Sequence, residues 1–157
     1  APGEFPNQGC GQKMPDGSFG PGLNQNGGAT WAAEWDPARH HIRTWFFPNG
    51  QEPEDLASHK PRPEFWGIPT SFFTLDPRFC SAGHFKNMRM VFDTTFCGDY
   101  GNPTFASSCP GVGMSCNDFV QKKPEEFAEA YWSIRGLDVY QRPGYATLEA
   151  KPMEPSR

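Results

Sequence analysis

Two carboxylates stand two residues apart at the end of a strand-like run. Glu34 and Asp36 follow a segment rich in β-forming residues, and side chains two apart on a strand point to the same face. Such a pair can perform general acid–base catalysis when the pKa of one carboxyl group is raised toward the working pH. Pro37 follows directly and predicts a turn, which is the wrong place for two reacting carboxylates. The pair therefore stays a weak catalytic candidate.

The five cysteines offer a second kind of chemistry. No C-x-x-C pair occurs, and no histidine stands at a ligand spacing beside a cysteine, so we expect neither a zinc site nor another metal or cofactor. Disulfides are the better interpretation. Cys80, Cys97, Cys109 and Cys116 crowd together and could form two bridges, whereas Cys10 stands apart and is left unpaired or available for an interchain bond.

The charge balance and hydropathy exclude two classes of partner. Lys and Arg total 14 against 18 Asp and Glu, without a basic run, so binding to a phosphate backbone is not expected. No apolar stretch approaches the roughly 18 residues of a membrane span. The first residues do not resemble a signal peptide. Because disulfides persist outside the cytoplasm, we expect a secreted, extracellular protein in mature form.

The elements that must position these residues are mainly strands. Aromatic residues reach 15% while hydrophobic residues total only 36%, a balance that suits sheets better than helix bundles. Residues 29–35 and 39–47 form the clearest hairpin, joined by a turn at 36–38. Residues 70–75 predict a short strand. The alternation of residues 86–96 predicts a long central one.

The rest of the chain predicts less regular structure. Residues 124–131 have the features of a helix, with Pro124 at the start and acidic residues in the first turn, and residues 132–141 return as a strand. Residues 1–28 are rich in Gly and Pro and should be irregular. Residues 142–157 should form a loosely packed tail. We expect one all-β domain over residues 1–157, an antiparallel sandwich or jelly roll with one short helix near the C-terminus.

Several motifs in this order resemble one family. The chain is similar to fungal glycoside hydrolase family 16, the laminarinase-like endo-β-1,3(4)-glucanases, over about residues 8–141. The motifs are G-C-G-Q-K at 9–13, N-G-G-A-T-W-A-A-E at 26–34, I-R-T-W-F-F-P at 42–48, W-G-I-P at 66–69, G-H-F at 83–85, F-D-T-T-F-C-G-D at 92–99 and A-Y-W-S-I at 130–134.

The resemblance covers only the C-terminal half of such an enzyme. It implies the second half of a concanavalin A-like β-jelly roll and a β-glucan partner. The family's E-x-D-x-x-E strand, which carries nucleophile and acid/base, has no counterpart here. The nearest match runs from Glu34 to Arg39, and an arginine cannot donate the proton. No catalytic residue is assigned, enzyme activity stays open, and this chain alone is expected to be inactive.

Four residues become candidates for substrate binding through the resemblance. Tyr100 follows the Cys-Gly-Asp run, where the family has an aromatic that stacks on a glucan ring; it could equally be an ordinary loop tyrosine. Asp99 could bind sugar hydroxyls or cap its turn. His84 could face the cleft or be structural. Trp66, in a loop, is the better exposed tryptophan, whereas the three hairpin tryptophans are expected in the core.

Three interpretations of the whole chain remain open. It could be a processed or truncated portion of a glucanase, a non-catalytic glucan-binding, defence or storage protein on the same scaffold, or one subunit of a nicked enzyme. Half a jelly roll would expose strand edges and an apolar face. We therefore expect pairing with a second copy or with the missing N-terminal half, unless the sandwich is rearranged.

Overall fold

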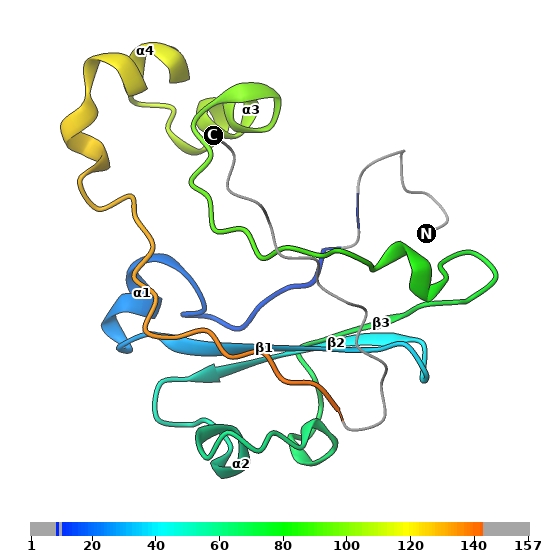
Figure 1. Ribbon diagram of the computed structural model, residues 1–157. Coiled ribbons are helices and arrows are strands. Elements are labelled where there is room, and N and C mark those ends of the chain that lie inside the picture. Colours follow the sequence, from blue (N-terminus) through cyan, green and yellow to red (C-terminus); the bar gives the residue numbers. More distant parts are fainter. Residues whose placement is uncertain (1–8, 10, 143–157) are drawn as a thin grey trace, which may run out of the picture. The chain divides into compact units, whose positions relative to one another are not determined.

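The computed structural model describes residue 9 and residues 11–142, and Cys10 and the expected tail at 143–157 lie outside this range. The described residues gather into two compact units, one ending at Lys86 and the other beginning at Asn87. The first unit contains every strand of the described chain, and the second contains its longer helices (Figure 1). Each unit is described by itself.

The first unit is built on a three-stranded antiparallel sheet in the order β1-β2-β3. Strand β1 covers Ala29–Asp36, β2 covers His41–Pro48 and β3 covers Ser71–Thr74. The register places Glu34 opposite Arg43 on the β1–β2 ladder. The hairpin and the short third strand are therefore confirmed as predicted elements.

Asp36 determines how the hairpin turns. Its Oδ1 accepts hydrogen bonds from the backbone N–H groups of Ala38 at 3.0 Å and Arg39 at 2.9 Å. A carboxylate that bonds to amides two and three residues ahead stabilises a turn without help from other segments. His40 closes the turn with a φ of +54°. The connection, residues 37–40, therefore ends two residues later than the predicted turn at 36–38.

Short helical elements fill the connections of the first unit. The segment 1–28, expected to be irregular, contains one helix in its described part, with a proline near the start. The long connection between β2 and β3 contains two more elements. The helix in the first segment is α1 (Gly20–Gln25). The connection between β2 and β3 contains α2 (Glu54–Ala57) and the 3-10 turn η1 (Pro63–Phe65). A further 3-10 turn, η2 (Ala82–His84), follows β3.

Tryptophans join that connection to the sheet. Trp45 on β2 is only 2% exposed, and the ring of Trp66 meets it edge-on with centroids 5.1 Å apart. Trp66 also packs edge-on against Phe47 at 5.6 Å. Such edge-to-face contacts add to the free energy gained by burial. The long connection is therefore packed against one face of the sheet.

The second unit holds helices that the sequence did not predict. Helix α3 covers Gly98–Ser108, α4 covers Cys116–Lys122 and the 3-10 turn η3 covers Pro124–Phe127. A disulfide joins Cys97 to Cys116, at the starts of α3 and α4. Four aromatic rings lie between these elements, in the contacts Phe105–Phe119, Phe119–Phe127 and Phe96–Phe127.

The antiparallel sheet confirms part of the predicted fold class, but the described residues form a single sheet rather than a sandwich of two. Three predicted elements are also wrong. Residues 86–96 and 132–141 have no strand structure, because a strand forms only where a neighbouring strand satisfies its backbone groups. The predicted helix at 124–131 is only the short turn η3. The expectation of a single helix missed α3, whose glycines and internal Pro103 are unfavourable in helices.

Cysteine pairing is partly as predicted. Cys97 and Cys116 form one bridge, whereas Cys80 and Cys109 have free thiols. The expected second bridge among these four is therefore absent from the described chain. The expectation for Cys10 is untested because that residue lies outside the described range.

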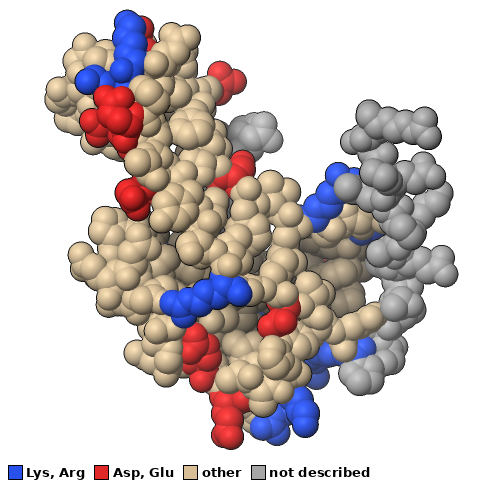
Figure 2. Space-filling model, turned by 60° about the vertical axis from the view of Figure 1, so that its left-hand side comes forward, with Lys and Arg blue, Asp and Glu red and all other residues tan. Residues whose placement is uncertain are grey.

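The described surface carries many exposed apolar side chains. On the face that Figure 2 shows, most of the surface belongs to neither basic nor acidic residues. The exposed large apolar residues include Trp31 in the first unit and Met88, Val91 and Tyr131 in the second. Among the described helices, none has the length and apolarity that crossing a bilayer requires.

The disulfide generates the first prediction. The double substitution Cys97→Ser and Cys116→Ser removes a cross-link between residues 19 apart, and links that close loops of this size contribute about 3 kcal/mol. We expect the free energy of unfolding to fall by about that amount. Urea unfolding, followed by the helical signal in far-UV circular dichroism, measures this change. The control Cys109→Ser, at an exposed thiol, should change stability by less than about 0.5 kcal/mol. Equal effects would contradict the assignment.

Candidate functional site

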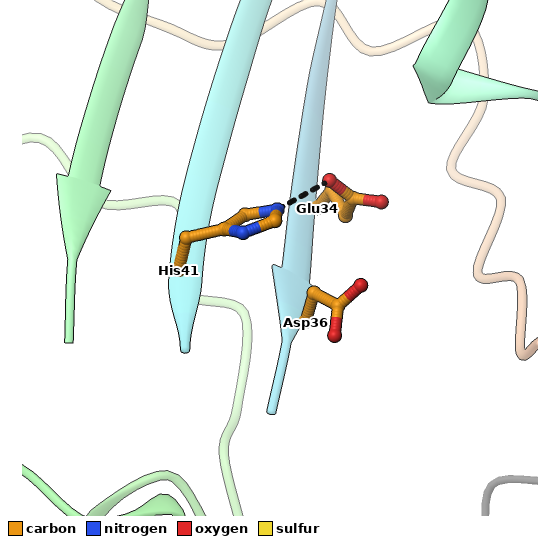
Figure 3. Close-up of side chains that lie close together, drawn as sticks. All are labelled: Glu34, Asp36 and His41. Atoms are coloured by element: carbon orange, nitrogen blue, oxygen red, sulfur yellow. Dashed lines mark hydrogen bonds and ion pairs between the residues drawn. The ribbon is translucent and has the colours of Figure 1, made fainter. Parts of the chain in front are cut away.

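A polar network lies on one face of the sheet. Glu34 and Asp36 lie two residues apart on β1, and His41 and Arg43 lie two residues apart on β2. Because residues two apart on a strand share a face, all four side chains lie on the same face of the sheet. The ladder places Glu34 opposite Arg43 and Asp36 opposite His41. Figure 3 shows His41 reaching from its strand toward Glu34. Three of them, Glu34, Asp36 and His41, form the one group of three or more His, Cys, Asp or Glu residues within reach of a common ion among the described residues.

Glu34 is the centre of the network. It is 8% exposed, and its Oε2 accepts a hydrogen bond from Arg43 Nε at 2.6 Å. The same oxygen lies 3.2 Å from His41 Nε2. A neighbouring guanidinium stabilises the ionised carboxylate. Glu34 is therefore held as a charged acceptor, which is the opposite of what a general acid needs.

The Asp36 carboxylate accepts hydrogen bonds within the turn. It is 2% exposed, and besides the two turn amides it accepts a hydrogen bond from Arg39 Nη1 through Oδ2 at 3.4 Å. A carboxylate that already accepts several hydrogen bonds has little capacity left to activate a water. The pair of Glu34 and Asp36, weak as a catalytic candidate from the sequence, is better explained as a structural device.

Three residues of the network also have the ligand types of a metal centre. Glu34, Asp36 and His41 offer ligand atoms that all lie within 4.8 Å of one another, and carboxylate with imidazole is a common ligand set for zinc. However, the Glu34 carboxylate already accepts a hydrogen bond of 2.6 Å from Arg43. A guanidinium at that position repels a divalent cation, so the donor set fits an ion-pair network better.

Aromatic rings surround the network. His41 stacks on Phe72 of β3 with centroids 5.3 Å apart, and the guanidinium of Arg43 lies 4.9 Å from the ring centroid of Trp45. Cation–π contacts of this kind stabilise a partly buried arginine. The network therefore links all three strands and continues into the tryptophan cluster.

Sequence reasoning missed the pairing of Glu34 with Arg43. The signal that could have found it is the hairpin register, since residue numbers that sum to 77 face each other on the ladder. The predicted turn at 36–38 would instead have placed Glu34 opposite His40. The register depends on the turn at 37–40, whose length the sequence did not reveal.

Two of the predicted binding residues lie together in the second unit. Asp99 and Tyr100 occupy the first turn of α3. The Tyr100 side chain is open, since the residue is 87% exposed, and its carbonyl accepts a hydrogen bond from Thr104 Oγ1 at 2.9 Å. Asp99 is also exposed. An exposed carboxylate and an exposed aromatic ring are therefore both present in the first turn of α3.

The other two predicted residues lie in the first unit. His84 is exposed in η2, with Nδ1 3.0 Å from the carbonyl oxygen of Ser81 and 3.3 Å from its Oγ. Trp66 is half-buried rather than open, because it packs on Trp45 and Phe47. The expectation that Trp66 is the better exposed tryptophan is therefore corrected. Trp31 is more exposed, and a role for any of them in glucan binding stays a prediction.

Asp55 holds Trp66 in this position. Its two carboxylate oxygens lie 3.1 and 3.0 Å from Trp66 Nε1, which donates to them, and the backbone N–H of Arg62 donates to Oδ2. Desolvation raises the pKa of Asp55, but the hydrogen bonds from Trp66 and Arg62 outweigh it and hold the pKa below the ordinary value. The ionised carboxylate therefore anchors the loop.

The Glu34–Arg43 pair generates the second prediction. Arg43→Met leaves the Glu34 carboxylate buried without its main partner, and breaking a buried pair in this way costs about 3 kcal/mol or more. Urea unfolding followed by tryptophan fluorescence should show this loss. Arg39→Met, which removes an exposed arginine from Asp36, is the matched control and should cost less than about 1 kcal/mol. An equally small loss for Arg43→Met would show that Glu34 does not need its partner.

The pKa of Asp55 generates the third prediction. A carboxyl group whose folded pKa is depressed stabilises the fold above its unfolded pKa, near 3.8, and loses this contribution as pH falls through the folded value. Asp55→Asn should therefore lower Tm at pH 7, with a difference from the unaltered chain that shrinks below pH 3.8. Asp16→Asn, at an exposed residue, should show no such difference. A Tm gap for Asp55→Asn that is independent of pH would contradict the role of the ionised carboxylate.

Comparison with known proteins identifies the family. A model of the XgeA-like catalytic domain of glycoside hydrolase family 16 matches residues 3–140. A probable glycosidase of Schizosaccharomyces pombe is 41% identical over 144 residues, which cover 90% of this chain and 33% of that protein. An endo-1,3(4)-beta-glucanase of Arthroderma benhamiae is 36% identical over 157 residues, which cover 97% of this chain and 33% of that protein.

A solved structure agrees with these relatives. It is described as an elongating family 16 beta-1,3-glucosyltransferase and matches with a TM-score of 0.59 and 38% sequence identity. The match covers 74% of this chain and 40% of the solved one. The chain thus spans about a third of the length of the curated relatives named above. The family model covers most of its residues, and the chain belongs to the XgeA-like group of glycoside hydrolase family 16.

Proposed function

We propose that this chain is the portion of a secreted family 16 protein that carries part of a β-glucan-binding surface but not the catalytic carboxylates. The observation that carries the proposal is the pair of Tyr100 and Asp99 at the start of α3. The Tyr100 residue is 87% exposed, and Asp99, which precedes it in sequence, is also exposed. An aromatic face packs against sugar C–H groups, while a carboxylate accepts hydrogen bonds from sugar hydroxyls.

Relatives support a glucan as the ligand. The Arthroderma benhamiae relative is named as an endo-1,3(4)-beta-glucanase, and the solved neighbour is named as a beta-1,3-glucosyltransferase. Both names describe action on β-linked glucose chains. Hydrolysis and glucosyl transfer both need a pair of carboxylates about 5–5.5 Å apart in a retaining mechanism. In this proposal those carboxylates belong to the remainder of a jelly roll of which this chain forms a part.

A second candidate is a non-catalytic glucan-binding, defence or storage protein on the same scaffold. The observation that favours it is the state of Glu34 and Asp36, which are buried and accept hydrogen bonds from Arg43 and the turn amides. The two candidates differ in whether hydrolysis appears when the chain is combined with the rest of a family 16 domain. They agree that the chain alone binds glucan.

The fourth prediction tests glucan binding. Tyr100→Ala removes the stacking face, which is worth about 1 kcal/mol or roughly a fivefold change in affinity. Pull-down on insoluble β-1,3-glucan should show this loss. Tyr131→Ala, at another exposed tyrosine of the second unit, is the matched control and should bind like the unaltered chain. Equal binding by all three, or no binding by the unaltered chain, would overturn the proposal.

Hydrolysis is measured in the same samples. Reducing sugar released from laminarin should stay at the level of a protein-free blank for the unaltered chain. Release that survives in Tyr100→Ala would contradict this expectation. If it also disappears in a variant with Glu34→Gln and Asp36→Asn that keeps the circular dichroism spectrum of the unaltered chain, the sheet carboxylates are catalytic after all.

A further inference from the structure

Two Asn-Gly sequences occur in the chain, at residues 26–27 and 49–50. In such a pair the backbone nitrogen of the glycine can attack the side-chain Cγ of the asparagine, since glycine has no Cβ to obstruct the approach. The attack closes a succinimide ring and releases ammonia. Asn26 and Asn49 are both exposed in turns, so the surroundings of each glycine nitrogen decide which pair reacts.

The turn after β2 lies against the segment that leads into β1. Asn49 N–H donates to the carbonyl oxygen of Gly28 at 3.1 Å. Gln51 N–H donates to the carbonyl oxygen of Pro48 at 2.9 Å and closes the turn. Gly50 has a φ of +80°, which glycine adopts without strain at the third position of such a turn. The second Asn-Gly pair is therefore held in a tight turn at the end of the hairpin.

A carboxylate is positioned at the glycine nitrogen of this turn. Gly50 N–H donates to Glu52 Oε2 at 2.8 Å. The other oxygen, Oε1, accepts a hydrogen bond from Thr30 Oγ1 on β1 at 3.0 Å, which keeps the half-buried side chain in place. A general base must lie within about 2.6–3.2 Å of the atom whose proton it takes. Glu52 meets this requirement for the nitrogen of Gly50.

The glycine nitrogen of the first pair faces a different kind of acceptor. Gly27 N–H donates to the carbonyl oxygen of Asn24 at 3.0 Å, at the C-terminal end of α1. A backbone carbonyl accepts a hydrogen bond but does not take up a proton at neutral pH, whereas a carboxylate can act as a base. The two pairs, equal in sequence, therefore differ in what stands at the attacking nitrogen.

We propose that Asn49 is a site of spontaneous deamidation in which Glu52 acts as the general base. Glu52 takes the proton of the Gly50 nitrogen while that nitrogen forms a bond to Asn49 Cγ. The Cγ–Nδ2 bond then breaks, and the departing nitrogen recovers the proton from Glu52 and leaves as ammonia. Water opens the succinimide to aspartate or isoaspartate, so one asparagine and one water give one acidic residue and one ammonia. The reaction is independent of glucan binding.

The product changes the end of the hairpin. Aspartate and isoaspartate both add a carboxylate at residue 49, three residues before the carboxylate of Glu52, and like charges at this separation repel one another. Isoaspartate also adds a main-chain atom at the residue whose N–H donates to Gly28. Deamidation is therefore expected to loosen the turn from the segment that leads into β1.

The fifth prediction tests this site by peptide mapping of the intact 157-residue chain after incubation at neutral pH. Trypsin cleaves after Arg39 and Arg43, so the two pairs fall in different peptides, and tandem mass spectrometry measures the deamidated fraction at each asparagine. Asn49 should react about tenfold faster than Asn26, since a positioned general base accelerates proton transfer by at least this factor. Equal rates at the two asparagines, or a faster rate at Asn26, would overturn the proposal.

Matched variants test the role of the base. Glu52→Gln keeps an oxygen for the Gly50 N–H but cannot take its proton, so it should slow deamidation at Asn49 about tenfold. Glu54→Gln, at an exposed carboxylate close in sequence, should leave the rate unchanged. In urea, where the folded geometry is lost, Asn49 and Asn26 should react at similar rates. An unchanged rate in Glu52→Gln, or a preference for Asn49 that persists in urea, would contradict the proposal.

Discussion

The buried carboxylate of Glu34 determines how the first unit is assembled. Burying a charge is unfavourable unless the charge is paired and hydrogen-bonded, and Arg43 with His41 meets that requirement from the neighbouring strand. The pairing holds only in the register that Asp36 imposes through its hydrogen bonds to the turn amides. Arg43 then lies against Trp45, and Trp45 against Trp66. Register, sheet and loop anchoring thus follow from one buried pair.

The second unit depends on a different constraint. Helix α3 contains glycines and a proline that disfavour helix formation, so its own propensity does little to hold it. The Cys97–Cys116 bridge and the phenylalanines between α3 and α4 supply the restraint. This arrangement keeps Tyr100 and Asp99 at an exposed helix start, where a flat ring and a carboxylate are available to a sugar.

Local signals made part of this predictable from the sequence. The hairpin and the third strand follow from alternation and from Asp36-Pro37, features that act within a few residues. The strands expected at 86–96 and 132–141 did not form, since a strand depends on a partner that the sequence pattern does not contain. Helix α3 escaped prediction because its residues are poor helix formers held by a disulfide.

The candidate site shows the same limit. The role of Glu34 depends on which residue faces it across the ladder, and a turn that ends two residues later than expected changed that partner to Arg43. As a loop residue, Trp66 was expected to be exposed. Its indole N–H instead donates hydrogen bonds to Asp55, and its ring packs against the sheet. Tyr100 kept the exposure that a sugar contact requires. The order of the sequence motifs therefore predicted the family, whereas tertiary contacts determine which side chains are exposed to a ligand.

The most direct measurement is a titration of the isotopically labelled chain with a β-1,3-linked glucose oligomer, followed by amide chemical shifts in NMR. The account predicts shifts centred on residues 98–101, around Asp99 and Tyr100, with the amides of Glu34 and His41 unchanged. Shifts centred on the sheet network, or no shifts at millimolar oligomer, would contradict it.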